Sequence, residues 1–194
     1  MNIVLATNNK HKADEIIKIM GIEDYRIYLQ NEVLEFPIEI EETGNTLEEN
    51  AFIKAITLYN IIGMPTLADD TGLEIDILNG APGVYSARYS GDNANDSENR
   101  AKILDEMKIQ SVRTAQFRSV LCFHDGVRTL FAEGICKGEI ISTERGLGGF
   151  GYDSIFLPLG KSVTFAEMTP DAKNEISHRR KALNEMRIIF EKYR

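Results

Sequence analysis

Two adjacent aspartates, Asp69 and Asp70, follow an apolar stretch that begins at Pro65, and they precede Thr71-Gly72. An apolar run that ends in a turn sequence is typical of a short buried strand, and we expect this strand to present both carboxylates at its end. Two ionised carboxylates about 4 Å apart repel by roughly 4 kcal/mol at an effective dielectric near 20. Either one of them is protonated or a cation lies between them. The alternative is a solvated pair of acids in an ordinary turn.

The bulk properties are those of one globular domain spanning residues 1–194. The chain has 194 residues, of which 43% are hydrophobic, and no repeat or linker marks a second domain. The formal charge of −8 argues against a broad nucleic-acid footprint. No apolar run has the length of a signal-peptide core or a membrane span, which predicts no membrane association.

The two cysteines, Cys122 and Cys136, fall in opposite arms of a predicted hairpin that turns at Asp125-Gly126. A two-residue turn there places Cys122 opposite Thr129, so we expect no disulfide. Reduced cysteines predict a cytoplasmic protein.

The N-terminal segment has the order of a strand, a polar loop and a helix. Ile3–Ala6 is apolar, residues 7–12 read Thr-Asn-Asn-Lys-His-Lys, and helical spacing follows up to Gly21. Backbone amides and the positive end of the helix dipole converge at such a junction and form an anion site. Thr7, Asn9 and Lys12 provide groups that bind phosphate oxygens. The alternative is a capped helix with solvated lysines.

The next acids lie near a second helix. Phe36, Ile38 and Ile40 alternate with polar residues, which predicts a strand whose period places Glu42 inward and Glu41 in solvent. Fraying of the strand end is the alternative. Thr46 opens a predicted helix that ends at Gly63 and carries Lys54 on the same side face as Asn50. Lys54 either faces a cleft or is a surface lysine.

The C-terminal third contains a glycine-rich loop and a group of cations. Residues 146–153 place four glycines around Phe150 and Tyr152, either of which can offer a stacking face, whereas a plain surface loop explains these aromatics poorly. Lys173, His178 and Arg179 then form a cationic cluster near predicted helix starts. The three histidines of the chain are scattered and have no zinc spacing.

In combination these segments resemble the inosine triphosphate pyrophosphatase family, the Ham-type enzymes, over nearly the whole length. The resemblance depends on the number and order of the following segments: Thr7-x-Asn9-x-x-Lys12, Glu41 to Gly44, Glu49-Asn50-Ala51 with Lys54, Ala68 to Leu73, Ala81 to Tyr89, Gly148 to Asp153, Lys173 and Ser177-His178-Arg179.

The resemblance implies an α/β fold with a long central mixed sheet and helices packed into two lobes around an active-site cleft, with no separable linker. It implies Mg²⁺-dependent hydrolysis of the deaminated purine nucleoside triphosphates ITP, dITP and XTP to monophosphate and pyrophosphate, by a homodimer. Asp70 would be the base that activates water, and Glu42, Asp70 and Asp69 would hold the metal. The implied substrate-binding residues are Thr7, Asn8, Asn9, Lys10, His11, Lys12, Lys54, Thr71, Phe150, Gly151, Tyr152, Asp153, Lys173, His178 and Arg179.

Two positions depart from the family's frequent pattern. Ser154 stands where many relatives have proline, and Arg180 stands where glycine is frequent. Neither departure removes a catalytic group. The rival readings are a Maf-like nucleotide pyrophosphatase and a catalytically silent nucleotide-binding module; retention of repelling acids speaks against the second.

Overall fold

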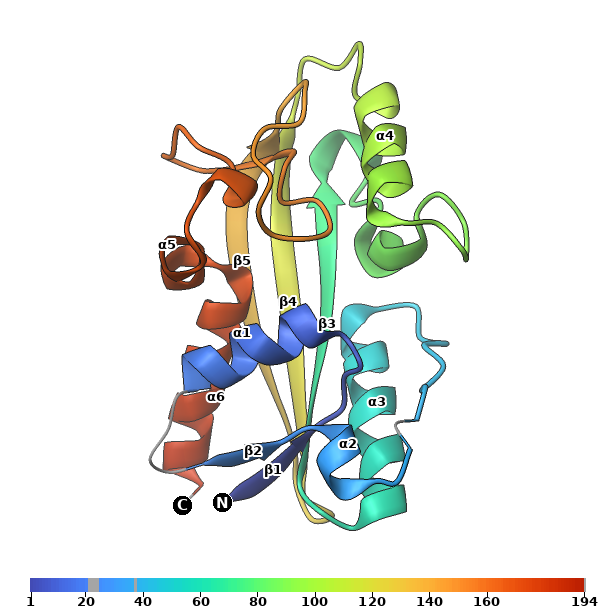
Figure 1. The fold of residues 1–194 in the computed structure, drawn as a ribbon, viewed down its shortest axis with the longest axis vertical. Helices are drawn as coiled ribbons and strands as arrows, with labels where there is room; N and C mark the ends of the chain where they lie inside the picture. Colours follow the sequence, from blue (N-terminus) through green and yellow to red (C-terminus); the bar gives the residue numbers. More distant parts are fainter. Residues whose placement is uncertain (21–24, 37, 194) are drawn as a thin grey trace. The chain divides into compact units, whose positions relative to one another are not determined.

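The structure is a computed structural model that describes residues 1–20, 25–36 and 38–193. It contains helices, strands and three short 3₁₀ helices (Figure 1). In chain order these are β1 (Asn2–Leu5), α1 (Lys10–Met20), β2 (Arg26–Tyr28), α2 (Gln30–Val33), α3 (Leu47–Ile62), β3 (Thr66–Ile75), η1 (Asp76–Leu78), η2 (Gly83–Arg88), α4 (Asp96–Glu106), β4 (Thr114–His124), β5 (Thr129–Ile140), β6 (Phe156–Pro158), η3 (Phe165–Glu167), α5 (Pro170–Ile176) and α6 (His178–Lys192).

The strands form one mixed sheet in the order β2-β1-β3-β4-β5-β6. β1 pairs in parallel with both β2 and β3, whereas β5 and β6 are antiparallel. The predicted α/β class with a mixed sheet is therefore confirmed. No helix among the described residues has both the length and the apolar content needed to cross a bilayer.

The chain divides into two compact units, and neither is a continuous piece of sequence. The first unit comprises residues 1–70, 119–134 and 179–194, and the second comprises residues 71–118 and 135–178. The boundary between them falls within β3, β4 and β5. The expectation of one domain with two lobes stays a prediction.

Each unit has its own apolar core. In the first unit, α1 and α6 lie on one side of the strands and α3 lies on the other (Figure 1). The core between the strands and the α1/α6 side includes Leu5, Ile16, Leu67, Phe123 and Leu183. The core of the second unit contains Leu73, Ile103, Phe117, Ile155 and Phe156, among others.

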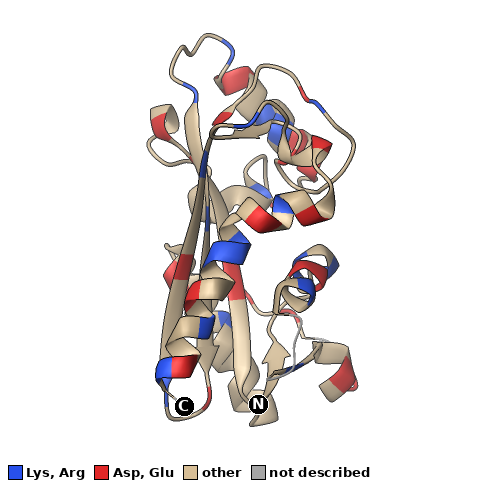
Figure 2. Ribbon diagram, turned by 90° about the vertical axis from the view of Figure 1, so that its left-hand side faces the viewer, with Lys and Arg blue, Asp and Glu red and all other residues tan. Residues whose placement is uncertain are grey.

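Acidic and basic residues alternate along the helices and do not form separate regions of positive and negative charge (Figure 2).

The predicted turn at Thr71-Gly72 is wrong, because β3 runs without a break from Thr66 to Ile75. Gly72 is needed there for close packing instead of for turning. A Cβ atom on Gly72 would lie 2.5 Å from the carbonyl oxygen of Gly83, within the same unit. The two aspartates thus lie in the middle of a long strand.

Two further local predictions need correction. Residues 38–42 form no strand among the described residues. The alternation holds there, since Ile38, Ile40 and Glu42 are partly buried whereas Glu39 and Glu41 are exposed, but it fails at Phe36, which is 74% exposed. Pro37 lies outside the described residues, as does Gly21. The β4–β5 turn lies one residue later than expected, since the backbone amide of Asp125 donates to the carbonyl oxygen of Arg128. Neither Cys122 nor Cys136 forms a disulfide with a described residue.

Candidate active site

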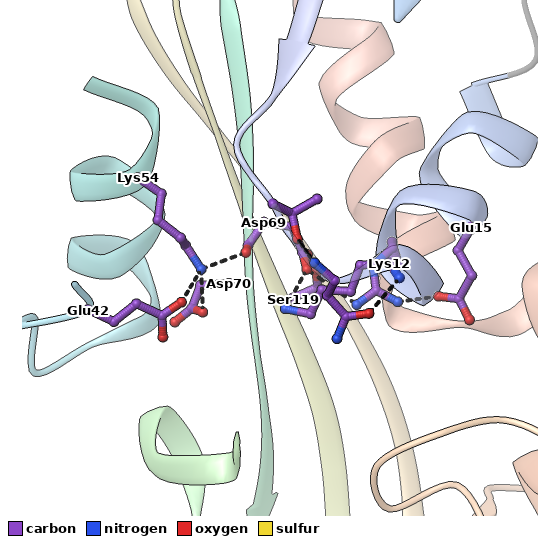
Figure 3. A network of polar contacts seen from close by, with 10 residues as sticks. Lys12, Glu15, Glu42, Lys54, Asp69, Asp70 and Ser119 are labelled. Carbon is purple, nitrogen blue, oxygen red and sulfur yellow. Dashed lines mark hydrogen bonds and ion pairs between the residues drawn. The ribbon is translucent and has the colours of Figure 1, made fainter. Parts of the chain in front are cut away.

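Asp69 and Asp70 point to opposite faces of β3, because successive side chains of a strand alternate. Figure 3 shows Asp70 with Lys54 and Glu42 on one side of the strand, and Asp69 with Ser119 and Lys12 on the other. The predicted repulsion between two neighbouring carboxylates therefore does not arise. Each carboxylate meets its own set of cations instead.

On the first face, Lys54 joins the two acids. Its Nζ atom lies 2.8 Å from Oε1 of Glu42 and 2.8 Å from Oδ1 of Asp70, and it also donates to the backbone carbonyl of Asp69. The Lys54 and Asp70 side chains are 9% and 7% exposed, and that of Glu42 is 29% exposed. Lys54 is therefore a buried residue that faces acids, and the surface alternative is excluded.

The start of α3 explains how Glu42 reaches this position. The backbone amide of Gly44 donates to Oδ1 of the buried Asn50 at 2.8 Å. A Cβ atom on Gly44 would lie 2.6 Å from Cβ of Glu49, so only glycine allows this close approach. The extended segment before α3 is thereby fixed against the helix face that carries Asn50 and Lys54.

The electrostatics of this face suit a base. Burial raises the pKa of Asp70 above the usual value for an aspartate, and Glu42 adds to the rise, although Lys54 and Lys12 partly offset it. Burial alone would lower the pKa of Lys54, but the charges of Asp70 and Glu42 raise it. A carboxylate with a raised pKa beside a fixed ammonium is a suitable acceptor for a proton from water.

One oxygen of Asp70 has no hydrogen-bond partner among the described residues. Oδ2 of Asp70 is buried and accepts no hydrogen bond from the described residues. Within that part of the chain, no group of three or more His, Cys, Asp or Glu residues could hold a metal. Two carboxylates with one unpartnered oxygen fit Mg²⁺, which commonly binds one or two carboxylates and completes its octahedron with water and substrate phosphates. Glu42 and Asp70 are the residues that would hold it.

On the second face, Asp69 is enclosed by donors. Ser119 donates to Oδ1, while Oδ2 lies 2.9 Å from Nζ of Lys12 and 3.3 Å from an Nη of Arg179. Arg179 also pairs with Glu15. Burial by itself raises the pKa of Asp69, but Arg179 and Lys12 outweigh it, and the pKa lies well below the usual value. This placement separates Asp69 from the other two predicted metal ligands.

Ser119 and Glu15 were missed from the sequence. Ser119 has a recognisable signal, because it is a polar residue directly before the buried run Val120 to Phe123 of β4. Glu15 follows Lys12 by three residues on α1 and thus lies on the same helix face, but an exposed salt bridge on a helix gives the same pattern.

The predicted phosphate loop, residues 7–12, has the capping contacts of an ordinary helix start, but its Lys12 is not solvated. Oγ1 of Thr7 accepts from the amide of Asn9, and Oδ1 of Asn9 accepts from the amide of Lys12, as ordinary capping groups do. Lys12 itself is not a solvated lysine, since its side chain is 16% exposed and it contacts Asp69. The side chain of Asn8 donates to the carbonyl of Ile38, whereas Lys10 and His11 are exposed on the first turn of α1.

In the second unit, the glycine-rich loop folds around Asp153. Oδ2 of Asp153 accepts from the amide of Phe150 at 2.9 Å and from Nζ of Lys173 at 2.7 Å. Gly149 has φ of 73°, and a Cβ atom there would lie 2.1 Å from Oδ2 of Asp153, so glycine is required. Nζ of Lys173 also lies 4.6 Å from the ring centroid of Phe150. The following Gly151 also has positive φ.

Phe150, which is partly exposed, is the aromatic that this loop offers for stacking. Tyr152 is 5% exposed and its hydroxyl donates to the carbonyl of Ser86, so it is a core residue. His178 is buried and its ring stacks on Phe117 at 4.8 Å between centroids. The predicted cluster of Lys173, His178 and Arg179 therefore has separate partners for each member.

The remaining predicted positions are also described. Thr71 is partly exposed on β3, directly after Asp70. At the first departure from the family's pattern, the hydroxyl of Ser154 donates to Glu144 at 2.8 Å, so the serine has a defined structural partner. At the second, Arg180 is partly buried on the first turn of α6.

A nucleotide-hydrolysing class agrees with this combination of a buried carboxylate base, a second acid and paired lysines. Residues 3–189 match the model of the Ham1 family. The chain is 47% identical over 185 residues to a dITP/XTP pyrophosphatase of Geobacter sulfurreducens, covering 93% of this chain and 92% of that protein. It is 45% identical over 194 residues to a dITP/XTP pyrophosphatase of Christiangramia forsetii, covering 96% and 97% of the two chains.

Two solved structures of Ham1 proteins are also similar to this chain. The Ham1 protein of Staphylococcus aureus is 36% identical, with a TM-score of 0.89 and full coverage of both chains. A HAM1 protein of Coxiella burnetii is 39% identical, with a TM-score of 0.89 and 99% coverage of both chains. The chain belongs to the Ham1 family.

Proposed function

We propose that this protein hydrolyses deaminated purine nucleoside triphosphates, namely ITP, dITP and XTP, to the monophosphate and pyrophosphate. The observation that carries the proposal is the group of Asp70, Glu42 and Lys54, in which one buried oxygen of Asp70 has no hydrogen-bond partner among the described residues. The two relatives described above are named dITP/XTP pyrophosphatases, which supports the choice of substrate. The proposal includes Mg²⁺ as cofactor, a homodimeric assembly and a cytoplasmic location.

In this proposal Asp70 removes a proton from the water that attacks the α-phosphorus. Its raised pKa makes it a stronger proton acceptor than an ordinary aspartate, while Lys54 holds its other oxygen in place. Mg²⁺, bound by Glu42 and Asp70, would lower the pKa of that water and neutralise phosphate charge. Lys12 and Lys54 stabilise the negative charge that grows on the departing pyrophosphate. Thr7 to Lys12 and Lys54 bind the triphosphate, and Thr71 contacts the substrate.

The base would be recognised by residues of the glycine-rich loop and by its neighbours. Phe150 provides the stacking face, and Gly151, Tyr152 and Asp153 shape the loop that presents it. Lys173, His178 and Arg179 stay candidates for contacts with the substrate. A donor aimed at the 6-oxo oxygen would favour hypoxanthine and xanthine over adenine, because an adenine would leave that donor unpaired.

The test is a panel of nucleoside triphosphates with Mg²⁺, in which pyrophosphate and phosphate are assayed separately. We expect pyrophosphate from ITP, dITP and XTP, and at least about 100-fold lower kcat/KM for ATP, as expected when a buried donor loses its partner. Release of phosphate alone would show that a different bond is cut. Preference for nucleotides other than these 6-oxo purines would favour the Maf-like alternative, and no turnover of any nucleotide would favour the silent binding module. Elution as a monomer on size-exclusion chromatography would contradict the homodimer.

A further inference from the structure

Asp69 and its partners form a group that supplies neither the proposed base nor the proposed metal ligands Glu42 and Asp70. The Asp69 group consists of Asp69, Lys12, Glu15, Ser119 and Arg179, and all five residues belong to the first unit. They come from four elements, since Asp69 lies on β3, Ser119 on β4, Lys12 and Glu15 on α1, and Arg179 on α6. Figure 3 shows Lys12, Ser119 and Glu15 gathered on the Asp69 side of β3.

The charges in the Asp69 group balance. The ion pairs join two cations, Lys12 and Arg179, to two anions, Asp69 and Glu15. Burying four such groups is expensive unless each is paired, and here the pairing is continuous from Lys12 through Asp69 and Arg179 to Glu15. A divalent cation at Asp69 would adjoin two cations that already neutralise it.

The exposure of the side chains also argues against a metal ion at Asp69. The Asp69 side chain is 0% exposed, and that of Arg179 is 1% exposed. Lys12, in contrast, is 16% exposed and lies in the first turn of α1, where the helix dipole favours an anion. A ligand that arrives from solvent can therefore reach the ammonium of Lys12, whereas the carboxylate of Asp69 is covered by its partners.

We propose that Asp69 is a positioning residue and not a metal ligand: it fixes the ammonium of Lys12 for binding of the triphosphate, and its second cation, Arg179, ties it to the start of α6. The adjacent aspartates then have separate tasks, with Asp70 serving metal and water and Asp69 serving the cations. Ser119 and Glu15 complete the arrangement by fixing the second oxygen of Asp69 and the guanidinium of Arg179. This inference rests on the proposed function for the identity of the anion that Lys12 meets.

The first test compares two isosteric variants of neighbouring residues, Asp69→Asn and Asp70→Asn, by binding of Mn²⁺ to the nucleotide-free protein. We expect Asp70→Asn to weaken Mn²⁺ binding by tenfold or more and Asp69→Asn to leave it within about twofold, because 1.4 kcal/mol of lost ligand energy corresponds to a factor of ten. A comparable loss in both variants would make Asp69 a metal ligand and overturn the inference. This experiment needs no turnover, so it stays decisive if the proposed substrates are not hydrolysed.

The second test asks whether Asp69 acts through Lys12. A double-mutant cycle combines Asp69→Asn with Lys12→Ala, with kcat and KM measured for ITP at a temperature where every variant is folded. We expect Asp69→Asn to raise KM about tenfold or more, and the double variant to be no worse than Lys12→Ala alone. Independent, multiplying losses, or an unchanged KM in Asp69→Asn, would refute the positioning role.

Ser119→Ala provides a milder version if Asp69→Asn does not fold. It removes one donor to Asp69 and leaves every charge in place. We expect a smaller rise in KM in the same direction, with Mn²⁺ binding unchanged. An unchanged KM in this variant together with weaker Mn²⁺ binding would contradict the inference.

Discussion

The two units each bury a lysine against an aspartate, but the surroundings of the two pairs differ. Lys54 in the first unit meets two carboxylates and a carbonyl oxygen, with no ring contact among the described residues. Lys173 in the second unit meets Asp153 and lies 4.6 and 5.6 Å from the centroids of Phe150 and Phe165. The first arrangement suits a highly charged ligand, and the second suits a flat, uncharged ring. Under the proposed function, the Lys54 pair would serve the phosphates and the Lys173 pair would serve the base.

The largest effect that would sharpen this comparison is expected for Asp70→Asn. We expect kcat for ITP to fall by about 10²–10⁴, the usual contribution of a general base. Stability should change little, because the raised pKa of Asp70 means that its charged form disfavours the folded state at neutral pH, and asparagine carries no such charge. Steady-state kinetics and thermal unfolding measure both quantities.

Asp105→Asn is the matched control for that variant, since Asp105 is exposed on α4. It should keep wild-type kcat. Near-normal turnover by Asp70→Asn would remove Asp70 as the base and would break the assignment of chemistry to the first unit.

A second prediction compares the two lysines directly by the free energy of unfolding. Lys54→Met leaves two acids without their shared partner, and we expect a loss of about 3–5 kcal/mol at pH 7. Lys173→Met leaves Asp153 with its backbone donor, and methionine still contacts the rings, so we expect about 1–3 kcal/mol.

Urea denaturation at equilibrium measures this difference. Equal losses in the free energy of unfolding would show that contact with the rings of Phe150 and Phe165 does not reduce the cost of replacing Lys173. A larger loss for Lys173→Met would reverse the comparison.

The third prediction concerns Phe150→Leu. Loss of a stacking face should raise KM for ITP by about 5- to 150-fold, which corresponds to 1–3 kcal/mol for one base on one aromatic side chain. Inhibition by tripolyphosphate, which carries no base, should keep its constant within about twofold. Phe36→Leu, at a side chain that is 74% exposed, is the matched control. Equal weakening of ITP and tripolyphosphate would contradict separate recognition of the two parts.

The smallest effect is expected at the cysteines, one of which lies in the core of each unit. Burial raises the pKa of the Cys122 thiol to about 12, so the reactive thiolate is scarce in the folded protein and becomes abundant only as pH rises toward that value. We expect no alkylation of Cys122 at about pH 8, whereas the denatured chain reacts fully. Mass spectrometry of each cysteine measures this, and fast labelling of Cys122 alone would show that the first unit opens more readily.

Local patterns predicted much of the fold and most of the acids. Alternation correctly placed Glu42 inward even though its segment is no strand, because an extended chain alternates whether or not it pairs. Helix signals located α3 closely from Thr46 and Gly63, whose capping roles depend only on neighbouring backbone.

The predictions that were wrong concern residues whose contact partners are distant in sequence. Thr71-Gly72 resembled a turn, because nothing local shows that Gly72 packs against the backbone of Gly83. Asp69 is shared among Lys12, Ser119 and Arg179, and Arg179 lies 110 positions from Asp69, so no short window of sequence contains these contacts. The sequence therefore predicted that Asp69 and Asp70 belong to one site, although their side chains lie on opposite faces of β3.

The uninterrupted course of β3 makes the spacing of this segment as important as its composition. Loss of a single codon between Pro65 and Asp69 would shift the register by one and exchange the faces of the two acids. Asp69 would then face Lys54, and Asp70 would face the side of β3 that carries Lys12. Both aspartates and both lysines would still be present in the sequence. An in-frame deletion there should therefore be far less tolerated than substitution of the same amino acid.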